Sequence, residues 1–318
     1  MRDRPLVTAR SGRFLVADAG ALAMHPDAVA AGVPRLDLPG GEGCKTFAGL
    51  EQVLRALAQA RIPRDGEIVV LGGGAVCDLG SLAASLYLRG VAHVLVPTTL
   101  LAMLDASVGG KTAINLPEGK NLVGTFWPAR EVVIDVGFVA TQDETGFRSG
   151  LGEALKIAVG LDAELFALLQ QQHALVMARE QAVLQRVIEL ALRTKQAIVA
   201  RDPRERGERK LLNLGHTLGH ALEAHSGFTL PHGLAVARGI LWVTERAQAQ
   251  GVLPAGDAAA IRSLLAVYGF TAWPLPPAAE LAPFLAVDKK GGDLVLPTAI
   301  GASRIVAGAQ RLLADEEL

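Results

Sequence analysis

The chain has 318 residues, half of them hydrophobic, and a formal net charge of −1. This size suits one large or two ordinary globular domains. The balanced charge disfavours nucleic acid and membranes as partners, because both usually require an excess of basic residues. No apolar run reaches the ~18 residues of a spanning helix, and the N-terminus lacks the apolar stretch of a signal peptide. With two cysteines and no CxxC motif, we expect a cytoplasmic protein without a disulfide framework.

The first part of the chain alternates β-type runs with helical stretches. The predicted strands cover 13–18, 67–74, 92–97 and 131–136, and the predicted helices cover 47–62 and 75–90. Such an alternation predicts a parallel, doubly wound α/β sheet with helices on both faces.

The later part of the chain is rich in Ala and Leu and has helical periodicity, which predicts a helical second domain. We expect the boundary between Asp135 and Ser149. Residues 1–143 are therefore assigned to the first domain and residues 144–318 to the second.

Three consecutive glycines, Gly72, Gly73 and Gly74, stand where a predicted strand gives way to a helix. Bare backbone can approach a pyrophosphate there, and the helix N-terminus supplies N–H donors. The dinucleotide fingerprint is incomplete, because Cys77 takes the place of its third glycine and the acidic residue about 20 positions later is absent. The turn therefore fits a nucleotide site and a plain tight turn equally well.

A second glycine stretch, DASVGGKTAIN (105–115), lacks the P-loop spacing, since Asp105 stands where that motif requires a glycine. We therefore exclude a P-loop. Lysines beside glycine turns commonly bind phosphate, and this region supplies Lys111 and Lys120 together with Asn121. Lys120 and Asn121 also fit a solvated turn.

A carboxylate and an ammonium group lie on one face of the helical run SGLGEALKIAVG, because Glu153 and Lys156 are three residues apart. A surface ion pair is one interpretation. The small and apolar neighbours favour a buried or cleft-facing pair at least as strongly. A carboxylate in such a place can ligate a divalent cation.

Four of the chain's seven histidines fall within residues 211–233, and three of them, His216, His220 and His232, are candidate ligands. His216 and His220 have the spacing of a helical metal pair, although the glutamate of an HExxH motif is missing, and His232 opens the next helix. With Glu153 upstream, we favour a metal site over core packing. The spacing does not decide which two of the three histidines coordinate.

Further cationic and amide groups near the histidines offer anion clamps, namely Lys195, Arg209 and Asn213. The segment 201–210 also fits an exposed charged loop. Lys289 and Lys290, in VDKKGGD, fit turn charges equally well.

Seven motifs occur in the order and at the spacings of the 3-dehydroquinate synthase family: LGGGAVCDLGS, LRGVAHVLVPTTLLAMLDASVGGKTAIN, GKNLVGTFWP, SGLGEALK, LLNLGHTLGHALE, HGLAV and DKK. The resemblance covers residues 42–300. It implies a Rossmann-like NAD-binding α/β domain over 1–143 and an all-α metal- and substrate-binding domain over 144–318. It also implies a catalytic divalent metal, Zn or Co, in the cleft and a homodimer.

The resemblance implies an activity as well. The family converts 3-deoxy-D-arabino-heptulosonate 7-phosphate, a small phosphorylated sugar acid, into 3-dehydroquinate and phosphate, in the shikimate pathway. The chemistry consists of transient oxidation by NAD, elimination of phosphate, return of the hydride and an intramolecular aldol reaction.

Site residues carry over from the same motifs. The metal ligands match Glu153, His216 and His232, while His220 faces the substrate phosphate. The catalytic group comprises Asp105, Lys111, Asn121, Lys156 and His220. The substrate-binding group comprises Arg89, which reaches the neighbouring subunit's site, and Lys111, Lys120, Asn121, Lys156, Lys195, Arg209, Asn213, His220 and Lys289. The NAD-binding group comprises Glu42, Lys45, Gly73, Gly74, Asp78, Thr98, Thr99, Phe138 and Thr141.

The chain departs from the family pattern at a few positions. The strand and turn that usually precede VAD are shortened or absent, and Gly20 stands where members often carry asparagine. Pro203 replaces a usual acidic residue. Leu234 replaces a usual glutamate, which removes a possible carboxylate behind the metal ligands.

Other functions stay open at this point. An aminodehydroquinate synthase would keep the same substrate contacts, whereas a 2-epi-5-epi-valiolone synthase would alter the positions of Arg209, Asn213 or His220. Their presence favours a substrate with both carboxylate and phosphate. A metal-dependent polyol dehydrogenase would lack the dense phosphate contacts, and a non-catalytic scaffold would have damaged metal ligands.

Overall fold

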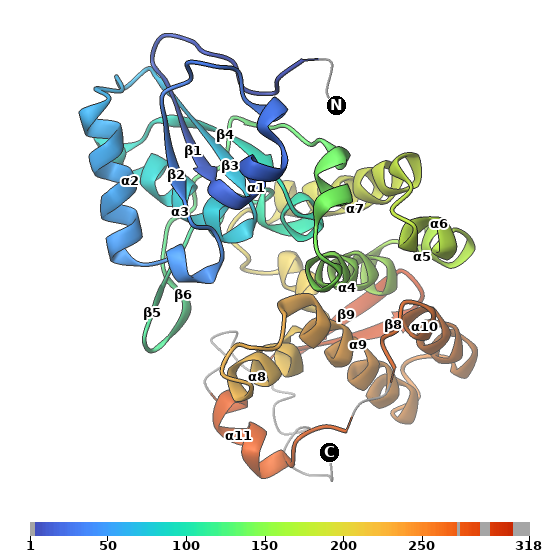
Figure 1. The fold of residues 1–318 in the computed structure, drawn as a ribbon. Helices are drawn as coiled ribbons and strands as arrows, with labels where there is room; N and C mark the ends of the chain where they lie inside the picture. Colours follow the sequence, from blue (N-terminus) through green and yellow to red (C-terminus); the bar gives the residue numbers. More distant parts are fainter. Residues whose placement is uncertain (1–3, 272–273, 287–292, 308–318) are drawn as a thin grey trace. The chain divides into compact units, whose positions relative to one another are not determined.

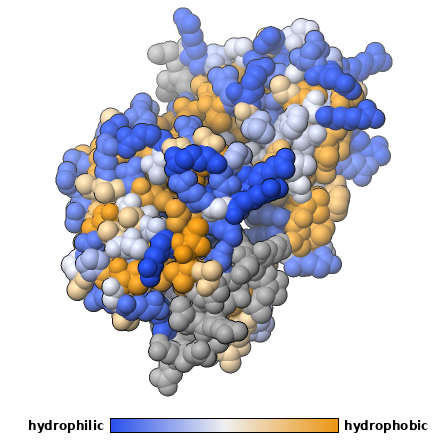
Figure 2. Space-filling view, turned by 180° about the vertical axis from the view of Figure 1, so that it is seen from behind, coloured by the Kyte–Doolittle hydropathy of each residue, from blue (hydrophilic) through white to orange (hydrophobic). Residues whose placement is uncertain are grey.

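The computed structural model describes residues 4–271, 274–286 and 293–307 (Figure 1). The chain folds as two compact units, Met1–Asp143 and Glu144–Leu318. Within the described ranges, no helix combines the length and the apolar character needed to cross a membrane. On the face drawn in Figure 2, hydrophobic residues lie among hydrophilic ones.

The first unit is built on a five-stranded sheet in which every pairing is parallel. Its order is β2-β1-β3-β4-β7. The strands are β1 (Arg13–Asp18), β2 (Arg35–Leu38), β3 (Glu67–Gly72), β4 (Ala92–Pro97) and β7 (Glu131–Val132). All six residues of β3 are buried, as expected for a central parallel strand covered on both faces. The predicted parallel α/β sheet is confirmed.

Helices α2 (Phe47–Gln59) and α3 (Gly74–Leu86) pack against one face of this sheet (Figure 1). Leu50, Val53 and Leu57 recur at helical spacing on α2 and are buried in the same core as sheet residues of β1, β3 and β4. The short elements of this unit are α1 (Ala19–Met24), η1 (Pro26–Ala28), η2 (Glu42–Cys44), η3 (Tyr87–Arg89), η4 (Ala102–Ala106) and η5 (Val136–Thr141).

Three local expectations need correction in this unit. The strand predicted over 131–136 is reduced to β7, because the Asp135 carboxylate accepts the Gly137 N–H at 2.8 Å and starts the 3₁₀ helix η5. The helix predicted to residue 90 ends at Leu86, where Leu88 and Arg89 take positive φ values of 50° and 67°. The region around Lys120 forms an antiparallel hairpin, β5 (Ile114–Leu116) and β6 (Gly119–Val123), that the sequence analysis did not predict.

The second unit is mainly helical, as predicted. Its helices are α4 (Glu144–Leu161), α5 (Ala163–Gln171), α6 (His173–Met177), α7 (Gln181–Arg201), η6 (Glu208–Asn213), α8 (His216–His225), α9 (His232–Ala249), α10 (Ala255–Val267) and α11 (Ala278–Ala286). The unit also contains an antiparallel ribbon, β8 (Leu294–Ala299) and β9 (Ala302–Val306), which the expectation of an all-α domain missed. Helix α9 packs against α4, α8, α10 and β8 and forms the centre of the unit.

Candidate functional site

Two imidazoles and one carboxylate converge inside the second unit. Glu153 lies in α4 and is fully buried, and its Oε1 is 3.2 Å from Nε2 of His232 and 3.7 Å from Nε2 of His216. One ligand atom from each residue lies within 4.8 Å of the others. Two imidazole nitrogens and a carboxylate oxygen are a donor set that suits Zn²⁺ and related divalent ions. The group therefore fits a three-ligand metal site.

Close helix packing brings these side chains together. A Cβ atom on Gly152 would lie 2.1 Å from the carbonyl oxygen of Gly233, so only glycine allows α4 to approach α9 at this point. The Gly233 N–H donates to Oγ of Ser149 at 2.9 Å. Glu153 directly follows Gly152 and His232 directly precedes Gly233, so this contact sets their side chains close together. The glycines of SGLGE and HGLAV thus have a steric role.

Each imidazole is also held from behind. Nδ1 of His216 lies 3.2 Å from the carbonyl oxygen of Leu214, and Nδ1 of His232 lies 2.9 Å from Oε2 of Glu223. Both contacts use Nδ1, so both Nε2 atoms face Glu153. The sequence analysis did not identify Glu223, although its position seven residues after His216 places it two helical turns further along α8.

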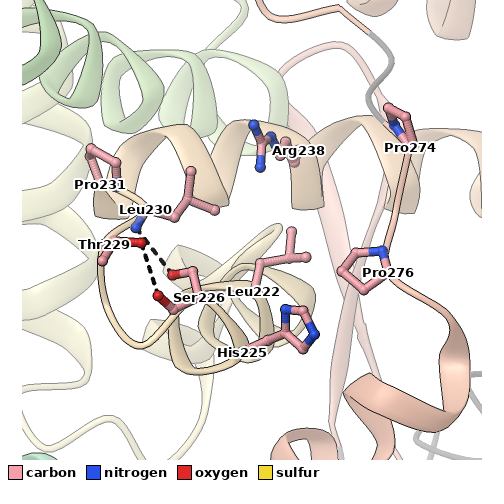
Figure 3. Close-up of a pocket in the computed structure, with 9 residues that line it drawn as sticks. All are labelled: Leu222, His225, Ser226, Thr229, Leu230, Pro231, Arg238, Pro274 and Pro276. Atoms are coloured by element: carbon pink, nitrogen blue, oxygen red, sulfur yellow. Dashed lines mark hydrogen bonds between the residues drawn. The ribbon is translucent and has the colours of Figure 1, made fainter.

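The turn between α8 and α9 fixes where His232 begins its helix (Figure 3). Ser226 Oγ accepts the N–H of Leu230 at 3.1 Å, and Thr229 Oγ1 donates to the Ser226 carbonyl at 2.8 Å. Pro231 follows as the N-cap of α9. A pocket of about 380 Å³ lies beside this turn, lined by Leu222, Pro231 and other residues, but none of the three converging side chains lines it. The pocket and the donor group are therefore distinct.

Buried charges surround the donor group. Lys156 Nζ donates to Oε2 of Glu153, and both side chains are almost completely buried. Burial acts to lower the pKa of His232, but hydrogen bonds and charges from Glu153 and Glu223 together raise it to about 10. The positive charges of Lys156 and His232 thus balance the buried carboxylates of Glu153 and Glu223.

His220 belongs to the same cluster. Its ring centroid lies 5.2 Å from that of His216 and 6.0 Å from that of His232. His220, Glu223 and His232 form a second group whose ligand atoms lie within 4.8 Å. His232 belongs to both groups, so the geometry favours His232 as one of the two histidine ligands. The second histidine is either His216 or His220.

Other predicted anion-binding residues of this unit lie on elements that pack together. The side chains of Lys156, Lys195 and Arg209 are buried. They lie on α4, α7 and η6, and these three elements pack against one another. Arg209 Nη1 donates to the carbonyl oxygen of Pro203 at 2.6 Å, and Asn213 Nδ2 donates to Oε1 of Glu205 at 2.7 Å. The sequence analysis missed Glu205. Lys289 lies outside the described residues.

In the first unit, the glycine turn lies at the carboxyl edge of the sheet. Gly73 is the N-cap of α3, Gly74 is the first residue of that helix, and the Thr98 N–H donates to the Gly72 carbonyl at 3.0 Å. A Cβ on Gly73 would meet Thr99 Cγ2 at 3.3 Å. Chain order reverses between β1 and β3, which is where doubly wound sheets bind ligands.

A polar cluster stands near this edge. Lys45 is 2 % exposed, and its Nζ donates to Asp78 Oδ2 at 2.7 Å and to Asn121 Oδ1 at 2.5 Å. Burial raises the pKa of Asp78 to about 6, although Lys45 opposes the rise. Asn115, which the sequence analysis did not single out, donates to Glu42 at 2.7 Å and accepts the Asn121 N–H at 2.9 Å. Residues predicted for NAD therefore contact one predicted for the substrate.

The remaining predicted residues of this unit lie on several other elements. Phe138 is buried, with its ring 4.7 Å from that of His25, and Thr141 Oγ1 lies 2.6 Å from His25 Nε2. Asp105 lies in η4, Lys120 lies in β6, and two exposed residues, Arg89 and Lys111, complete the group. Lys120 and Asn121 lie in strand β6 and not in a turn, although Asn121 is exposed and has a positive φ of 56°.

A parallel α/β unit followed by a helical unit is the architecture of solved sugar phosphate cyclases. The chain is similar to 2-epi-5-epi-valiolone synthase from Streptomyces hygroscopicus, solved with NAD⁺ and Zn²⁺ (29 % identity, TM-score 0.86, 95 % of this chain and 88 % of that one). It is also similar to 2-deoxy-scyllo-inosose synthase, solved with carbaglucose-6-phosphate, NAD⁺ and Co²⁺ (25 % identity, TM-score 0.80, 97 % and 88 %).

Family models identify the particular group. The model described as 3-dehydroquinate synthase N-terminal matches residues 35–149, and the C-terminal one matches residues 150–291. A 3-dehydroquinate synthase of Geobacter metallireducens is 45 % identical over 73 % of this chain and 64 % of its own length. That of Laribacter hongkongensis is 43 % identical over 85 % and 76 %. The chain belongs to the 3-dehydroquinate synthase family.

Proposed function

We propose that this protein is a 3-dehydroquinate synthase that uses NAD⁺ and one divalent metal ion, Zn²⁺ or Co²⁺. Its substrate is 3-deoxy-D-arabino-heptulosonate 7-phosphate, and its products are 3-dehydroquinate and phosphate. The observation that carries the proposal is the convergence of Glu153, His216 and His232 in a chain of this family. The names of the curated relatives support the substrate.

Under this proposal the second unit holds the metal and the substrate. Glu153, His216 and His232 would hold the ion, which when bound supplies a Lewis acid with open positions for substrate hydroxyls. Lys156 neutralises the carboxylate of Glu153 and keeps it in place. The buried cations Lys195 and Arg209 bind the anionic ends of the substrate and orient it.

The first unit binds the nucleotide. NAD⁺ supplies a hydride acceptor that is regenerated within each turnover. The backbone at Gly73 and Gly74 lets a pyrophosphate approach the N-terminus of α3. Glu42 and Lys45 bind the adenosine end, and Asp78 lies with Gly73 and Gly74 at the pyrophosphate turn. The ion pairs of Lys45 with Glu42 and Asp78 support this placement.

A direct assay tests the proposal. The purified protein is mixed with NAD⁺, Zn²⁺ and the heptulosonate phosphate, and free phosphate is measured together with the enone formed by a coupling dehydratase. We expect phosphate release without net accumulation of NADH, because the hydride returns to the substrate. Steady NADH production from a simple polyol would instead identify a dehydrogenase and contradict the proposal.

A different cyclase activity is the second candidate, favoured by the similarity to two cyclases that are not dehydroquinate synthases. Glucose 6-phosphate, which has no carboxylate, discriminates between the two. Phosphate release from glucose 6-phosphate but not from the heptulosonate phosphate would support the second candidate. We favour the first, because Arg209, Asn213 and His220 offer contacts for both a phosphate and a carboxylate.

The assembly and location are part of the same proposal. We propose a homodimer in which Arg89 reaches the neighbouring subunit's site, supported by the exposure of Leu86 and Leu88 beside it. Mixing inactive Arg89→Ala and His216→Ala subunits should restore part of the activity, because mixed dimers contain one intact site. A cytoplasmic location is supported by Cys44 and Cys77, which are both free thiols.

A further inference from the structure

The feature that the proposed function leaves unused is the buried carboxylate of Glu223. Glu223 is 4 % exposed and lies in α8, one helical turn beyond His220. Its Oε2 is 2.9 Å from Nδ1 of His232, and this nitrogen is on the far side of the imidazole from Glu153. The family resemblance did not assign Glu223 to the metal or the substrate.

The contact fixes the protonation pattern of the ring. A carboxylate accepts a hydrogen bond, so Nδ1 of His232 carries the proton and donates it to Glu223. Nε2, the atom 3.2 Å from Glu153 Oε1, is then the nitrogen that can release its proton and present a lone pair to an ion. A carboxylate behind a histidine ligand also increases the basicity of the ligating nitrogen.

We propose that Glu223 is a positioning residue that orients His232, so that Nε2 faces the ion shared with Glu153 and His216. The inference rests on the proposed metal ligands and adds the residue that aligns one of them. Glu223 thereby supplies a buried carboxylate behind one of the ligands.

The main alternative is that Glu223 is itself a ligand. Its carboxylate, His220 and His232 form the second group of converging donors. In that arrangement Nδ1 of His232 would bind the ion, and Glu153 and His216 would not. The two arrangements therefore predict that different nitrogens of His232 bind the ion, Nε2 in the first and Nδ1 in the second. They also predict that metal affinity depends on different residues.

Metal binding by the full-length protein distinguishes them. The metal-free protein is titrated with Zn²⁺ against a chromophoric chelator, and with Co²⁺ while the visible spectrum is recorded. For Glu223→Gln we expect Zn²⁺ affinity about 10-fold weaker, and for Glu223→Ala about 100-fold weaker. The Co²⁺ spectrum of Glu223→Gln should keep its shape, because the three ligand atoms remain.

The tautomer provides a second readout that a merely structural role would not change. Long-range ¹H–¹⁵N NMR of the Zn²⁺-loaded protein should show His232 with its proton on Nδ1 and the metal on Nε2. The Nδ1 proton should have the downfield shift of a hydrogen bond to a carboxylate. In Glu223→Gln this proton should shift upfield, because a neutral amide oxygen is a weaker acceptor, while Nε2 stays bound to the metal.

Control variants distinguish failure of the positioning role from failure of the proposed ligand set. Glu245→Gln, an exposed glutamate in α9, should bind Zn²⁺ as the natural protein does. If Glu153→Gln loses the metal and both Glu223 variants keep it at full affinity, the positioning role is wrong while the ligand set stands. If Glu153→Gln keeps the metal and His220→Asn loses it together with Glu223→Gln, then Glu223 is a ligand, and both the inference and the proposed ligand set fail.

Discussion

The two candidate binding regions are built by different means. The donor group of the second unit lies on long helices that approach each other through glycine, and its carboxylate is fully buried. The Lys45 cluster of the first unit lies on a 3₁₀ segment, a helix and a hairpin strand, and Glu42 and Asn121 are exposed. Helix packing therefore sets the geometry of the donor group, whereas hydrogen bonds between its own side chains set the geometry of the Lys45 cluster. Substitutions should have larger effects in the helical unit.

The largest effect is expected for Glu153→Gln. The change keeps the shape of the side chain but removes the negative charge. Because Glu153 is a proposed ligand, Zn²⁺ affinity should fall by more than about 100-fold, the upper range for a residue that only supports a ligand. Turnover should be lost. In the metal-free protein, Lys156 loses its buried partner, which should reduce the free energy of unfolding by about 3 kcal/mol. Chelator competition and thermal unfolding measure the two effects, and unchanged metal affinity would contradict the proposed ligand set.

Gly152→Ala tests whether packing sets the geometry. The new Cβ would clash with the carbonyl oxygen of Gly233, so α4 and α9 must separate. We expect a loss of about 2–3 kcal/mol in unfolding free energy together with weaker Zn²⁺ binding. Gly256→Ala is the control, because it lies in α10 with no atom within 4 Å of its Cβ, and it should be neutral or slightly stabilising. Equal behaviour of the two variants would argue against a packing-defined site.

A pH test concerns the core of the first unit. His93 is 1 % exposed, neither ring nitrogen has a hydrogen-bond partner within the described ranges, and burial lowers its pKa to about 4. Between about pH 6.5 and pH 4 the unfolded chain binds the proton and the folded chain does not, so stability falls as the pH falls. The full effect is about 3 kcal/mol. His93→Leu should therefore lose less stability between about pH 8 and pH 5 in thermal unfolding.

The surface control for that experiment is His173→Leu, because His173 is exposed at the start of α6. It should follow the pH dependence of the natural protein. If the His93 and His173 variants respond alike to acid, the buried neutral imidazole is not the source of the acid sensitivity.

The smallest effect is expected for Glu42→Gln. Glu42 is 52 % exposed and bonded to Asn115, so its replacement should leave stability almost unchanged and weaken NAD⁺ binding about 3- to 10-fold, or about 1 kcal/mol. Calorimetric titration with NAD⁺ measures this change. Glu51→Gln, also exposed and on α2, should leave the affinity unchanged, and a loss of Zn²⁺ binding in Glu42→Gln would contradict the separation of the two regions.

Much of the sheet could be predicted from sequence because its central strands are continuous apolar runs. EIVVLG and AHVLVP form β3 and β4 as expected. The edge strand RLDL alternates but is only four residues long, and the hairpin around Lys120 is polar and buries little, so both were missed.

The candidate metal group was predictable in part. His216 and Glu153 stand out because charged and ring side chains interrupt apolar helices. Their convergence is a tertiary contact, through Gly152 and Gly233, that no local spacing reveals. Glu223 was missed for the same reason, because its partner His232 lies beyond a turn. Glu205 was missed because it lies in the charged segment 201–210, where nothing in the sequence distinguishes it from the neighbouring acidic residues.

The short turn held by Ser226 has a consequence for the order of assembly. It joins α8 and α9 directly, so His216, Glu223 and His232 meet through contacts between chain neighbours, which close at small entropic cost. Glu153 arrives from a much earlier segment, across α5, α6 and α7. The contacts between α8 and α9 are therefore local, whereas bringing Glu153 beside them requires a much longer loop to close.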